Sequence, residues 1–255
     1  MFLTNTDGAD EWARLMLRYG SALKQVATKI DILNNEFMQV YHYNPIEHVK
    51  SRIKSAESIV KKLKRIGAEV TLENMEAYLS DIAGIRIICS FTSDIYLIAD
   101  LISSQGDIKV LRIKNYIANP KENGYQSYHM IISVPVYLLD GPVETKVEIQ
   151  IRTIAMDFWA SLEHKIRYKF EGKAPAYIEE QLKGCAEIVN KLDAKMLSLN
   201  REIQAVAAAQ VAQPDLDEQQ KTNEQMQEAW EESGSLQVPH DPKEKQSKDR
   251  EDPEI

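Results

Sequence analysis

The segment that most constrains the fold of this chain is GIRIICSF, residues 84–91, which is apolar at nearly every position. Such a strand must be covered on both faces, so this run predicts a central strand of a sheet. Three further runs show strand patterning between turn residues: 108–117, 128–138 and 143–152. The last two are joined by Asp140-Gly141-Pro142, which predicts an antiparallel pair.

Helical periodicity surrounds these strands. The predicted helices span residues 12–37, 46–66, 72–80, 94–104, 154–169 and 178–203. In the fifth of them, Phe158, Trp159, Leu162 and Ile166 are expected to point inward. Helices before and after a mostly β middle, itself crossed by one helix, predict an α+β fold with a mixed sheet of about five strands and long helices at both ends.

The net charge of −8 is concentrated at one end of the chain. Residues 214–255 contain thirteen acidic and five basic residues, a difference that accounts for all of it, so the remainder is neutral. From Ala205 onward the chain is rich in Gln, Glu, Asp, Lys and Pro and poor in residues that build a core. We therefore expect one domain over residues 1–204 and an acidic, mostly disordered tail over residues 205–255.

Several protein classes are excluded by composition. No apolar run reaches the length of about 18 residues that a membrane span requires, and the first residues lack a signal-peptide pattern. Cys89 and Cys185 match no metal-binding or redox spacing. We expect a cytoplasmic protein without membrane association, neither a disulfide scaffold nor a secreted mini-protein.

A strongly basic segment, residues 50–65, is the first candidate for a binding surface. It contains seven basic residues and one acid. On a helix, one face would gather Lys54, Ser58, Lys61, Lys62 and Arg65. Arg52 would fall on the apolar face, where an arginine needs a partner such as a phosphate or a stacked base. A solvated basic face is the alternative for the whole segment.

Two carboxylates stand on or beside the predicted strands. Asp81 and Arg86 bracket the entry into the buried strand, next to Gly84, which lets another group approach closely. Strand alternation puts Glu148 on the polar face of its strand, together with Gln150. Asp81 and Glu148 would offer hard oxygen ligands to Mg²⁺. The alternatives are a turn residue at position 81 and a solvated outer face at position 148.

The segment KNYIANPKENGYQSYH, residues 114–129, gathers hydrogen-bond donors around aromatic rings. Its polar members are Lys114, Lys121, Asn123, Gln126 and His129, and Tyr125 offers a ring on which a base could stack. No G-x-x-x-x-G-K-[ST] or G-x-G-x-x-G motif occurs, and Asn-Pro and Asn-Gly also suit a plain hairpin loop. The patterns alone predict a cationic cleft with two carboxylates, suited to a phosphate-rich substrate and Mg²⁺.

Four ordered motifs indicate a family. They are HYNPIEHVKSRIKSAESIVKKLKR, DIAGIRIICSF, IKNYIANPKENGYQSYH and VEIQIRTIAMDFWASLEHKI. Over roughly residues 40–200 the chain resembles the RelA/SpoT-type (p)ppGpp synthetase domain. No stretch resembles the hydrolase domain or the long regulatory domains of that family. The resemblance is therefore to a small alarmone synthetase, closer to the RelP than to the RelQ type, without hydrolase activity.

This resemblance implies a nucleotidyltransferase-like fold and a GTP pyrophosphokinase. Such enzymes transfer the β,γ-pyrophosphate of ATP to the 3′-hydroxyl of GDP or GTP, which yields AMP and the stringent-response alarmone ppGpp or pppGpp. The implied catalytic pair, Asp81 and Glu148, would bind Mg²⁺, and Glu148 would also accept the proton of the attacking hydroxyl. The implied ATP-binding residues are Arg52, Lys54, Ser58, Lys62, Arg65 and Arg86, with both Arg52 and Arg86 against the adenine. The implied GDP- or GTP-binding residues are Lys114, Lys121, Asn123, Tyr125, His129, Gln150 and Arg152, with Tyr125 stacked on guanine.

Two expectations concern partners. The apolar stripe along residues 178–203 has a period near 3.5, which with the resemblance predicts a homotetramer; an intramolecular core is the alternative. A non-catalytic nucleotide- or RNA-binding protein on the same scaffold is the competing hypothesis. A binder of polyanions has no use for two carboxylates in a cationic cleft, so we favour the synthetase. Glu163 and His164 are adjacent without further ligands at metal spacing, and a structural role is predicted for them.

Overall fold

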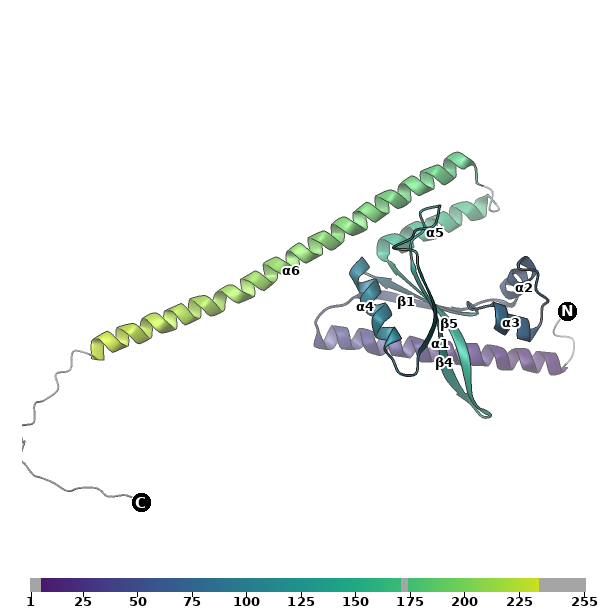
Figure 1. Cartoon of the computed structure of the whole chain (residues 1–255), viewed down its shortest axis with the longest axis horizontal. Helices are drawn as coiled ribbons and strands as arrows, with labels where there is room; N and C mark the ends of the chain where they lie inside the picture. The colour runs from purple at the N-terminus through teal and green to yellow at the C-terminus, as the bar shows by residue number, and fades with distance from the viewer. Residues whose placement is uncertain (1–5, 171–173, 234–255) are drawn as a thin grey trace, which may run out of the picture. The chain divides into compact units, whose positions relative to one another are not determined.

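The computed structural model describes residues 6–170 and 174–233. At its centre is a five-stranded sheet with the order β1-β2-β5-β4-β3 (Figure 1). The strands are β1 Ile46–Ile53, β2 Ala83–Cys89, β3 Lys109–Asn115, β4 Tyr128–Leu138 and β5 Gly141–Thr153. β2 and β5 are parallel and the other neighbours are antiparallel, so the predicted mixed sheet is confirmed. The predicted β4–β5 hairpin is confirmed as well.

Six helices accompany the sheet in the described part of the chain. They are α1 Thr6–Val40, α2 Ala56–Arg65, α3 Leu72–Tyr78, α4 Thr92–Ser103, α5 Ile154–Lys169 and α6 Ala176–Ser233. The predicted long helices at both ends are present as α1 and α6 (Figure 1). None of the described helices holds a stretch long and apolar enough for a membrane crossing.

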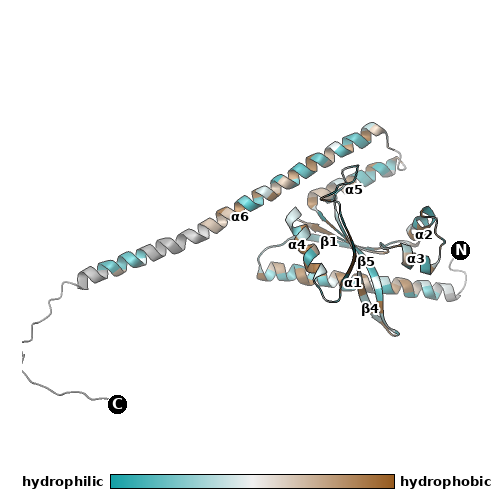
Figure 2. Cartoon of the chain, viewed as in Figure 1, coloured by the Kyte–Doolittle hydropathy of each residue, from teal (hydrophilic) through white to brown (hydrophobic). Residues whose placement is uncertain are grey.

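One face of the sheet is apolar and carries the core. Ile85 and Ile87 of β2 pack in the same cluster as Ile149 of β5 and Val26 of α1, all fully buried. α4 adds Ile95, Ile98 and Ile102 to this cluster. Hydrophobic residues accordingly mark one side of α1 (Figure 2). Because side chains alternate between the faces of a strand, the polar residues of β2 and β5 share the opposite face.

The segment 46–53 is a strand, and the prediction of one helix over residues 46–66 is wrong for its first half. Ile46, Val49 and Ile53 fit helical spacing, but this segment pairs with β2 instead, and only Ile46 is buried. Charged residues are common on an edge strand, where they discourage pairing with other chains. The helix begins after Ser55, whose side chain accepts a hydrogen bond from the backbone N–H of Ser58, a signal that the periodicity concealed.

The inward face of α5 differs from the prediction. Trp159 is buried as expected, but Phe158 is 62% exposed and Leu162 is 40% exposed. The packed face instead runs through Met156, Trp159 and Ala160. A helix with apolar residues on several sides leaves its orientation undecided by periodicity, and here packing against α6 decides it.

The chain divides into two units at residue 200, and the domain boundary expected at residue 204 stays a prediction. Residues 205–233 are helical, whereas mostly disordered chain was predicted there. Ala, Gln, Glu and Lys are strong helix formers, which explains a helix without a core to cover. The side chains of residues 221–228 are exposed, as their composition predicts. Residues 234–255 of the predicted tail lie outside the described residues.

Candidate active site

Strand register brings the predicted site residues onto the polar face of the sheet. Arg52 pairs with Gly84 between β1 and β2, and Gly84 in turn pairs with Glu148 of β5. A row further along joins Arg86 of β2, Gln150 of β5 and His129 of β4. A cavity of 160 Å³ lies on this face, lined by Lys50, Ser51, Arg52, Gly84, Ile85, Arg86, Glu148 and Gln150.

The side chain of Arg52 lies over Gly84. A Cβ atom at position 84 would lie 3.9 Å from Cγ of Arg52, so the arginine side chain crosses directly over the glycine. Any side chain longer than alanine would compete with Arg52 for this space. The Gly84 that the sequence analysis singled out therefore serves the placement of Arg52.

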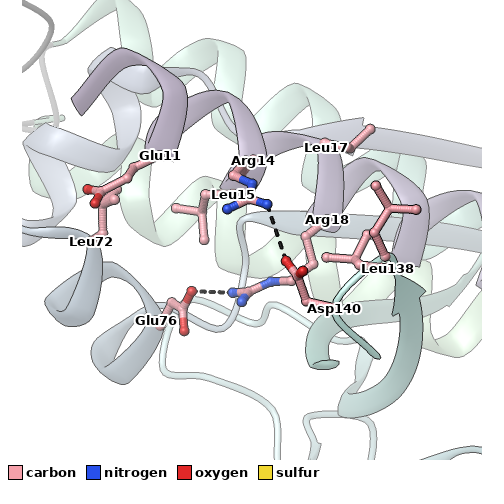
Figure 3. Close-up of a pocket in the computed structure, with 10 residues that line it drawn as sticks. Glu11, Arg14, Leu15, Leu17, Arg18, Leu72, Glu76, Leu138 and Asp140 are labelled. Carbon is pink, nitrogen blue, oxygen red and sulfur yellow. Dashed lines mark hydrogen bonds and ion pairs between the residues drawn. The ribbon is translucent and has the colours of Figure 1, made fainter. Parts of the chain in front are cut away.

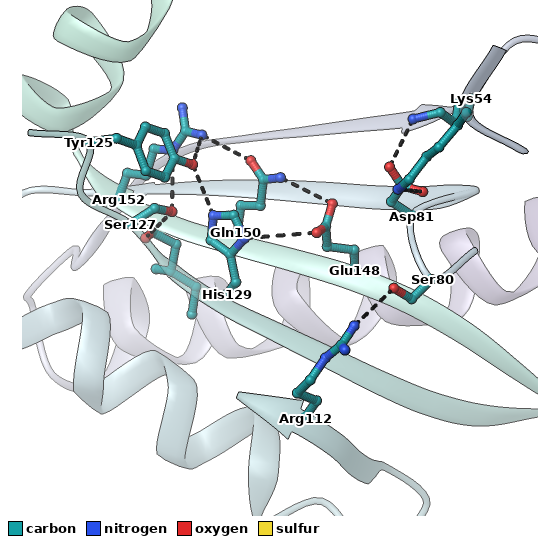
Figure 4. Close-up of polar contacts among 12 residues, drawn as sticks. Lys54, Ser80, Asp81, Arg112, Tyr125, Ser127, His129, Glu148, Gln150 and Arg152 are labelled. Atoms are coloured by element: carbon teal, nitrogen blue, oxygen red, sulfur yellow. Dashed lines mark hydrogen bonds and ion pairs between the residues drawn. The ribbon is translucent and has the colours of Figure 1, made fainter. Parts of the chain in front are cut away.

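Asp81 is held between two lysines. Its Oδ2 accepts a hydrogen bond from Nζ of Lys54 at 2.8 Å (Figure 4). Its Oδ1 lies 2.7 Å from Nζ of Lys62. Burial favours the neutral acid, but the hydrogen bonds and charges of the two lysines outweigh it and hold the pKa of Asp81 below its ordinary value. Asp81 is therefore ionised at neutral pH, with two cations beside it.

Glu148 is the second carboxylate of the site. Its Oε2 accepts a hydrogen bond from Nε2 of Gln150 at 3.1 Å. Burial and the negative charge of Asp81 raise the pKa of Glu148 above its ordinary value of 4.5. Two neighbouring carboxylates of this kind favour a cation between them.

The donor set fits Mg²⁺ that is shared with a phosphate ligand. Mg²⁺ is usually bound by one or two carboxylates, with waters and substrate phosphates completing its shell. Asp81 and Glu148 supply that number of carboxylates. The described residues contain no group of three His, Cys, Asp or Glu side chains able to hold a metal by themselves.

Arg152 organises the other half of the site. Its side chain is only 6% exposed. Its Nη2 donates to Oη of Tyr125 at 2.5 Å and to Oε1 of Gln150 at 3.0 Å, and its Nε donates to Oγ of Ser127 at 3.3 Å. Its Nη1 donates to Oδ1 of Asp157 at 3.0 Å. Arg152 thus fixes Tyr125 through the hydroxyl group of that residue.

His129 is neutral at physiological pH. Burial, followed by the charges of Arg152 and Lys121, lowers the pKa of His129 to about 3. The 3.8 Å approach of its Nδ1 to Oε1 of Glu148 is therefore no ion pair. Oη of Tyr125, which accepts from Arg152, also lies 2.9 Å from Nε2 of His129, and the imidazole tautomer decides which of these two groups donates.

The loop before β4 is anchored by two contacts. Asn123 accepts a hydrogen bond from the backbone N–H of Tyr125 and donates one to Glu163 of α5. Gly124 has a φ of 84°, and a Cβ atom there would lie 2.5 Å from Cβ of Ala186 in α6. Only glycine meets both conditions. The amide of Asn123 holds the loop in this structure, so its contact with a phosphate stays a prediction.

The remaining predicted residues lie toward the rim. Nζ of Lys121 lies 4.7 Å from the ring centroid of Tyr125, within cation–π range. Lys114 of β3 is the direct partner of His129 across the sheet. Ser58 and Arg65 are on the exposed side of α2. Within the described residues, no hydrogen bond or ion pair joins Arg65 to the site.

Asp157 and Ser127 are site residues that the sequence analysis missed. Asp157 lies in the first turn of α5, where an acidic residue suits the helix terminus and draws no attention. Oδ1 of Asp157 lies 3.1 Å from Nη1 of Arg86 as well as within reach of Arg152. Only the folded structure reveals that one carboxylate serves both arginines.

A larger hollow of 380 Å³ lies at the N-terminal half of α1 and beside the β4–β5 turn (Figure 3). Its cations are already paired, Arg14 with Asp140 at 3.2 Å and Arg18 with Glu76. It shares no lining residue with the smaller cavity on the polar face. The larger cavity is therefore not the better candidate for the active site, because the carboxylate Glu148 and the cations Arg52 and Arg86 line the smaller one.

Two carboxylates, several cations and the ring of Tyr125 thus lie on the polar side of a mixed sheet. Residues 51–173 match the family model described as the region found in RelA / SpoT proteins. The chain is 48% identical to GTP pyrophosphokinase YwaC of Bacillus subtilis (strain 168) over 194 residues, 76% of this chain and 92% of that protein.

Solved structures agree with this match. The structure of small alarmone synthetase 2 from Bacillus subtilis superposes with a TM-score of 0.69 at 48% identity, covering 75% of this chain and 99% of that one. Small alarmone synthetase 1 from Bacillus subtilis, bound to its product pppGpp, gives a TM-score of 0.72 at 33% identity, covering 76% and 99%. The chain belongs to the RelA/SpoT family, in the group of small alarmone synthetases, as its motifs predicted. None of these names carries a RelP or RelQ label, so the RelP type stays a prediction.

Proposed function

We propose that this chain is a GTP pyrophosphokinase, which transfers the β,γ-pyrophosphate of ATP to the 3′-hydroxyl of GDP or GTP and releases AMP. The observation that carries this proposal is the carboxylate pair Asp81 and Glu148 beside a cationic cavity. A 48% identical relative with the name GTP pyrophosphokinase, and a related synthetase with bound pppGpp, support the same reaction.

The ATP side of the site is formed by β1, β2 and α2. Arg52 and Arg86 flank Gly84 and would hold the adenine between their guanidinium planes. Lys54 and Lys62, which hold Asp81 in this structure, would turn to the triphosphate. Ser58 and Arg65 would complete this subsite from the exposed side of α2.

The acceptor side is formed by β4, β5 and the loop before β4. Tyr125 would stack on guanine, with its ring held by Arg152 and His129. Lys121 would leave the ring of Tyr125 for the acceptor phosphates, which Lys114, Asn123 and His129 would also contact. Gln150 and Arg152 would support the wall of the site through the bonds that they already make.

Mg²⁺ would be held by Asp81 and Glu148 and, when bound, would neutralise charge on the transferred phosphates. The elevated pKa of Glu148 makes it a stronger base than an ordinary glutamate, suited to accept the proton of the 3′-hydroxyl. The other contribution of the chain is to hold donor and acceptor in line.

Assembly and location are part of the same proposal. Along α6 the apolar residues Ile188, Leu192, Met196, Leu199 and Ile203 are exposed, and Figure 2 shows hydrophobic residues interspersed along this helix. We propose that further copies of the chain cover them in a homotetramer in the cytoplasm. Light scattering after gel filtration should give four times the chain mass, and a monomer at micromolar concentration would refute this.

The reaction is tested by incubation of purified protein with Mg²⁺, ATP and either GDP or GTP, followed by separation of the nucleotides. A guanosine tetra- or pentaphosphate should appear together with AMP, and the two acceptors can be ranked by rate. Binding of both nucleotides without product would favour the competing hypothesis of a non-catalytic binding protein. Glu148→Gln serves as the inactive control.

A further inference from the structure

One carboxylate joins the two halves of the site. Oδ1 of Asp157 lies 3.1 Å from Nη1 of Arg86 and 3.0 Å from Nη1 of Arg152. Arg86 belongs to β2 on the proposed ATP side, and Arg152 belongs to β5 and holds the proposed acceptor side. The side chain of Asp157 is 15% exposed, so both contacts are shielded from water.

The two arginines need a negative charge between them. Arg86 and Arg152 have side chains that are 35% and 6% exposed, and their charges repel each other at short range. Burial and the charge of Arg152 lower the pKa of Arg86, and the carboxylate of Asp157 opposes that effect. Without Asp157, the guanidinium groups would separate and Arg152 would lose one of its four hydrogen bonds.

The contacts continue beyond the arginines. Arg152 donates to Oη of Tyr125, the ring proposed to stack on guanine. A continuous series therefore runs from Arg86 through Asp157 and Arg152 to Tyr125 (Figure 4 shows the bonds of Arg152 to Tyr125 and Gln150). Ordering one end of such a series reduces the entropy that must be lost at the other end.

We propose that Asp157 is a positioning residue that couples the ATP subsite to the acceptor subsite, so that either nucleotide strengthens binding of the other. This inference rests on the proposed function, because it takes its two ligands from it. Asp157 is not itself part of the cavity lining, but it contacts Arg86, which is. A merely structural role, as an acid in the first turn of α5, would stabilise the helix without coupling the subsites.

The test is calorimetric binding of GDP, with and without saturating α,β-methylene ATP, to the full chain in Mg²⁺ buffer. For the wild type, the analogue should tighten GDP binding about fivefold or more, a typical size for coupling between sites. Asp157→Asn keeps the shape of the side chain and removes the charge, and it should reduce this factor to below about twofold. The same ratio must appear when the order of addition is reversed, because coupling is reciprocal.

Asp193→Asn is the matched control. Asp193 is another partly buried aspartate of the domain and accepts a hydrogen bond from Thr153; in the described part of the chain no hydrogen bond or ion pair joins it to Arg86 or Arg152. This variant should keep the coupling of the wild type. Equal loss of coupling in both variants, or unchanged coupling in Asp157→Asn, would overturn the proposal.

A second variant covers the case in which Asp157→Asn does not fold. Tyr125→Phe keeps the aromatic ring but removes the hydroxyl that Arg152 binds, so coupling should fall while binding of the analogue alone stays unchanged. If the analogue tightens GDP binding to Tyr125→Phe as much as to the wild type, the contact between Arg152 and Tyr125 does not transmit the coupling, and the proposal is refuted. If wild-type protein binds both nucleotides with coupling but makes no product, the proposed reaction fails and this inference stands.

Discussion

Replacement of Tyr125 by alanine is the substitution that most clearly separates the two halves of the site. The ring of Tyr125 is proposed to stack on the guanine of the acceptor, and its hydroxyl accepts from Arg152 at 2.5 Å. No hydrogen bond or ion pair joins Tyr125 to Arg52, Lys54 or Lys62 among the described residues. Tyr125→Ala should therefore weaken the acceptor and leave the ATP subsite in place.

The size of the effect follows from these two contacts. Stacking of a base on an aromatic side chain contributes about 1–3 kcal/mol by alanine substitution. Loss of the hydroxyl adds less, because Nη2 of Arg152 keeps its bond to Gln150 at 3.0 Å. The expected rise in KM for GDP or GTP is about 10- to 100-fold, at about 1.4 kcal/mol for each factor of ten.

The assay is steady-state kinetics with each substrate varied in turn, together with binding of α,β-methylene ATP alone. KM for ATP should change far less than that for the acceptor, and the affinity for the analogue alone should stay within about twofold. Tyr137→Ala, which removes a 75% exposed ring at the far end of β4, is the control. Equal losses for both nucleotides would refute guanine stacking on Tyr125.

Three further substitutions test the rest of the account. Glu148→Gln keeps the hydrogen bond from Gln150 but can neither accept a proton nor bind Mg²⁺. We expect kcat to fall by a factor of about 10² or more while the melting temperature stays unchanged. A pure variant that is still active would show that Glu148 is not a catalytic residue. In Gly124→Ala the new Cβ atom would lie 2.5 Å from Cβ of Ala186, so the loop must shift and KM for the acceptor should rise several-fold. Gly106→Ala is the control, because a Cβ atom at position 106 meets no other atom within 4 Å. Equal KM values for the two variants would show that this loop does not bind the acceptor. Burial raises the pKa of Asp193 in the folded protein. Above that pKa the ionised carboxylate lowers the free energy of unfolding, and this destabilisation is lost as the pH falls below it. Asp193→Asn should therefore stabilise the protein in urea unfolding at pH 7 and do so less at pH 4, and a gain that is independent of pH would contradict this origin.

The inner strands could be predicted from sequence because their patterns admit one structure only. The run 84–91 is apolar at nearly every position and therefore indicated a central strand, whereas the strict alternation of 143–152 indicated both a strand and its polar face. The prediction for residues 46–53 was wrong because three apolar residues in a charged segment are compatible with a helix as well as with an edge strand. Pairing with β2 decided between the two, and no local pattern records that partner.

The proposed site residues divide in a similar way. Alternation alone placed Glu148 and Gln150 on one polar face, and the pairing of β2 with β5 that brings Arg86 beside them comes from the structure. Asp157 could not be predicted, because its role depends on how α5 packs beside β2, 71 positions from Arg86 in the chain. The helix over residues 205–233 was missed because poor core-forming composition argues against packing, not against local helix formation.

The central claim is transfer of an intact pyrophosphate group, and the position of a radioactive label tests it most directly. Purified protein, Mg²⁺ and GDP are incubated in parallel with ATP labelled at the α-phosphorus and with ATP labelled at the γ-phosphorus. Pyrophosphate transfer predicts that the γ-label appears in a guanosine tetraphosphate and the α-label only in AMP. Formation of ADP with γ-label in GTP, or no labelled guanosine product while both nucleotides bind, would contradict the assignment.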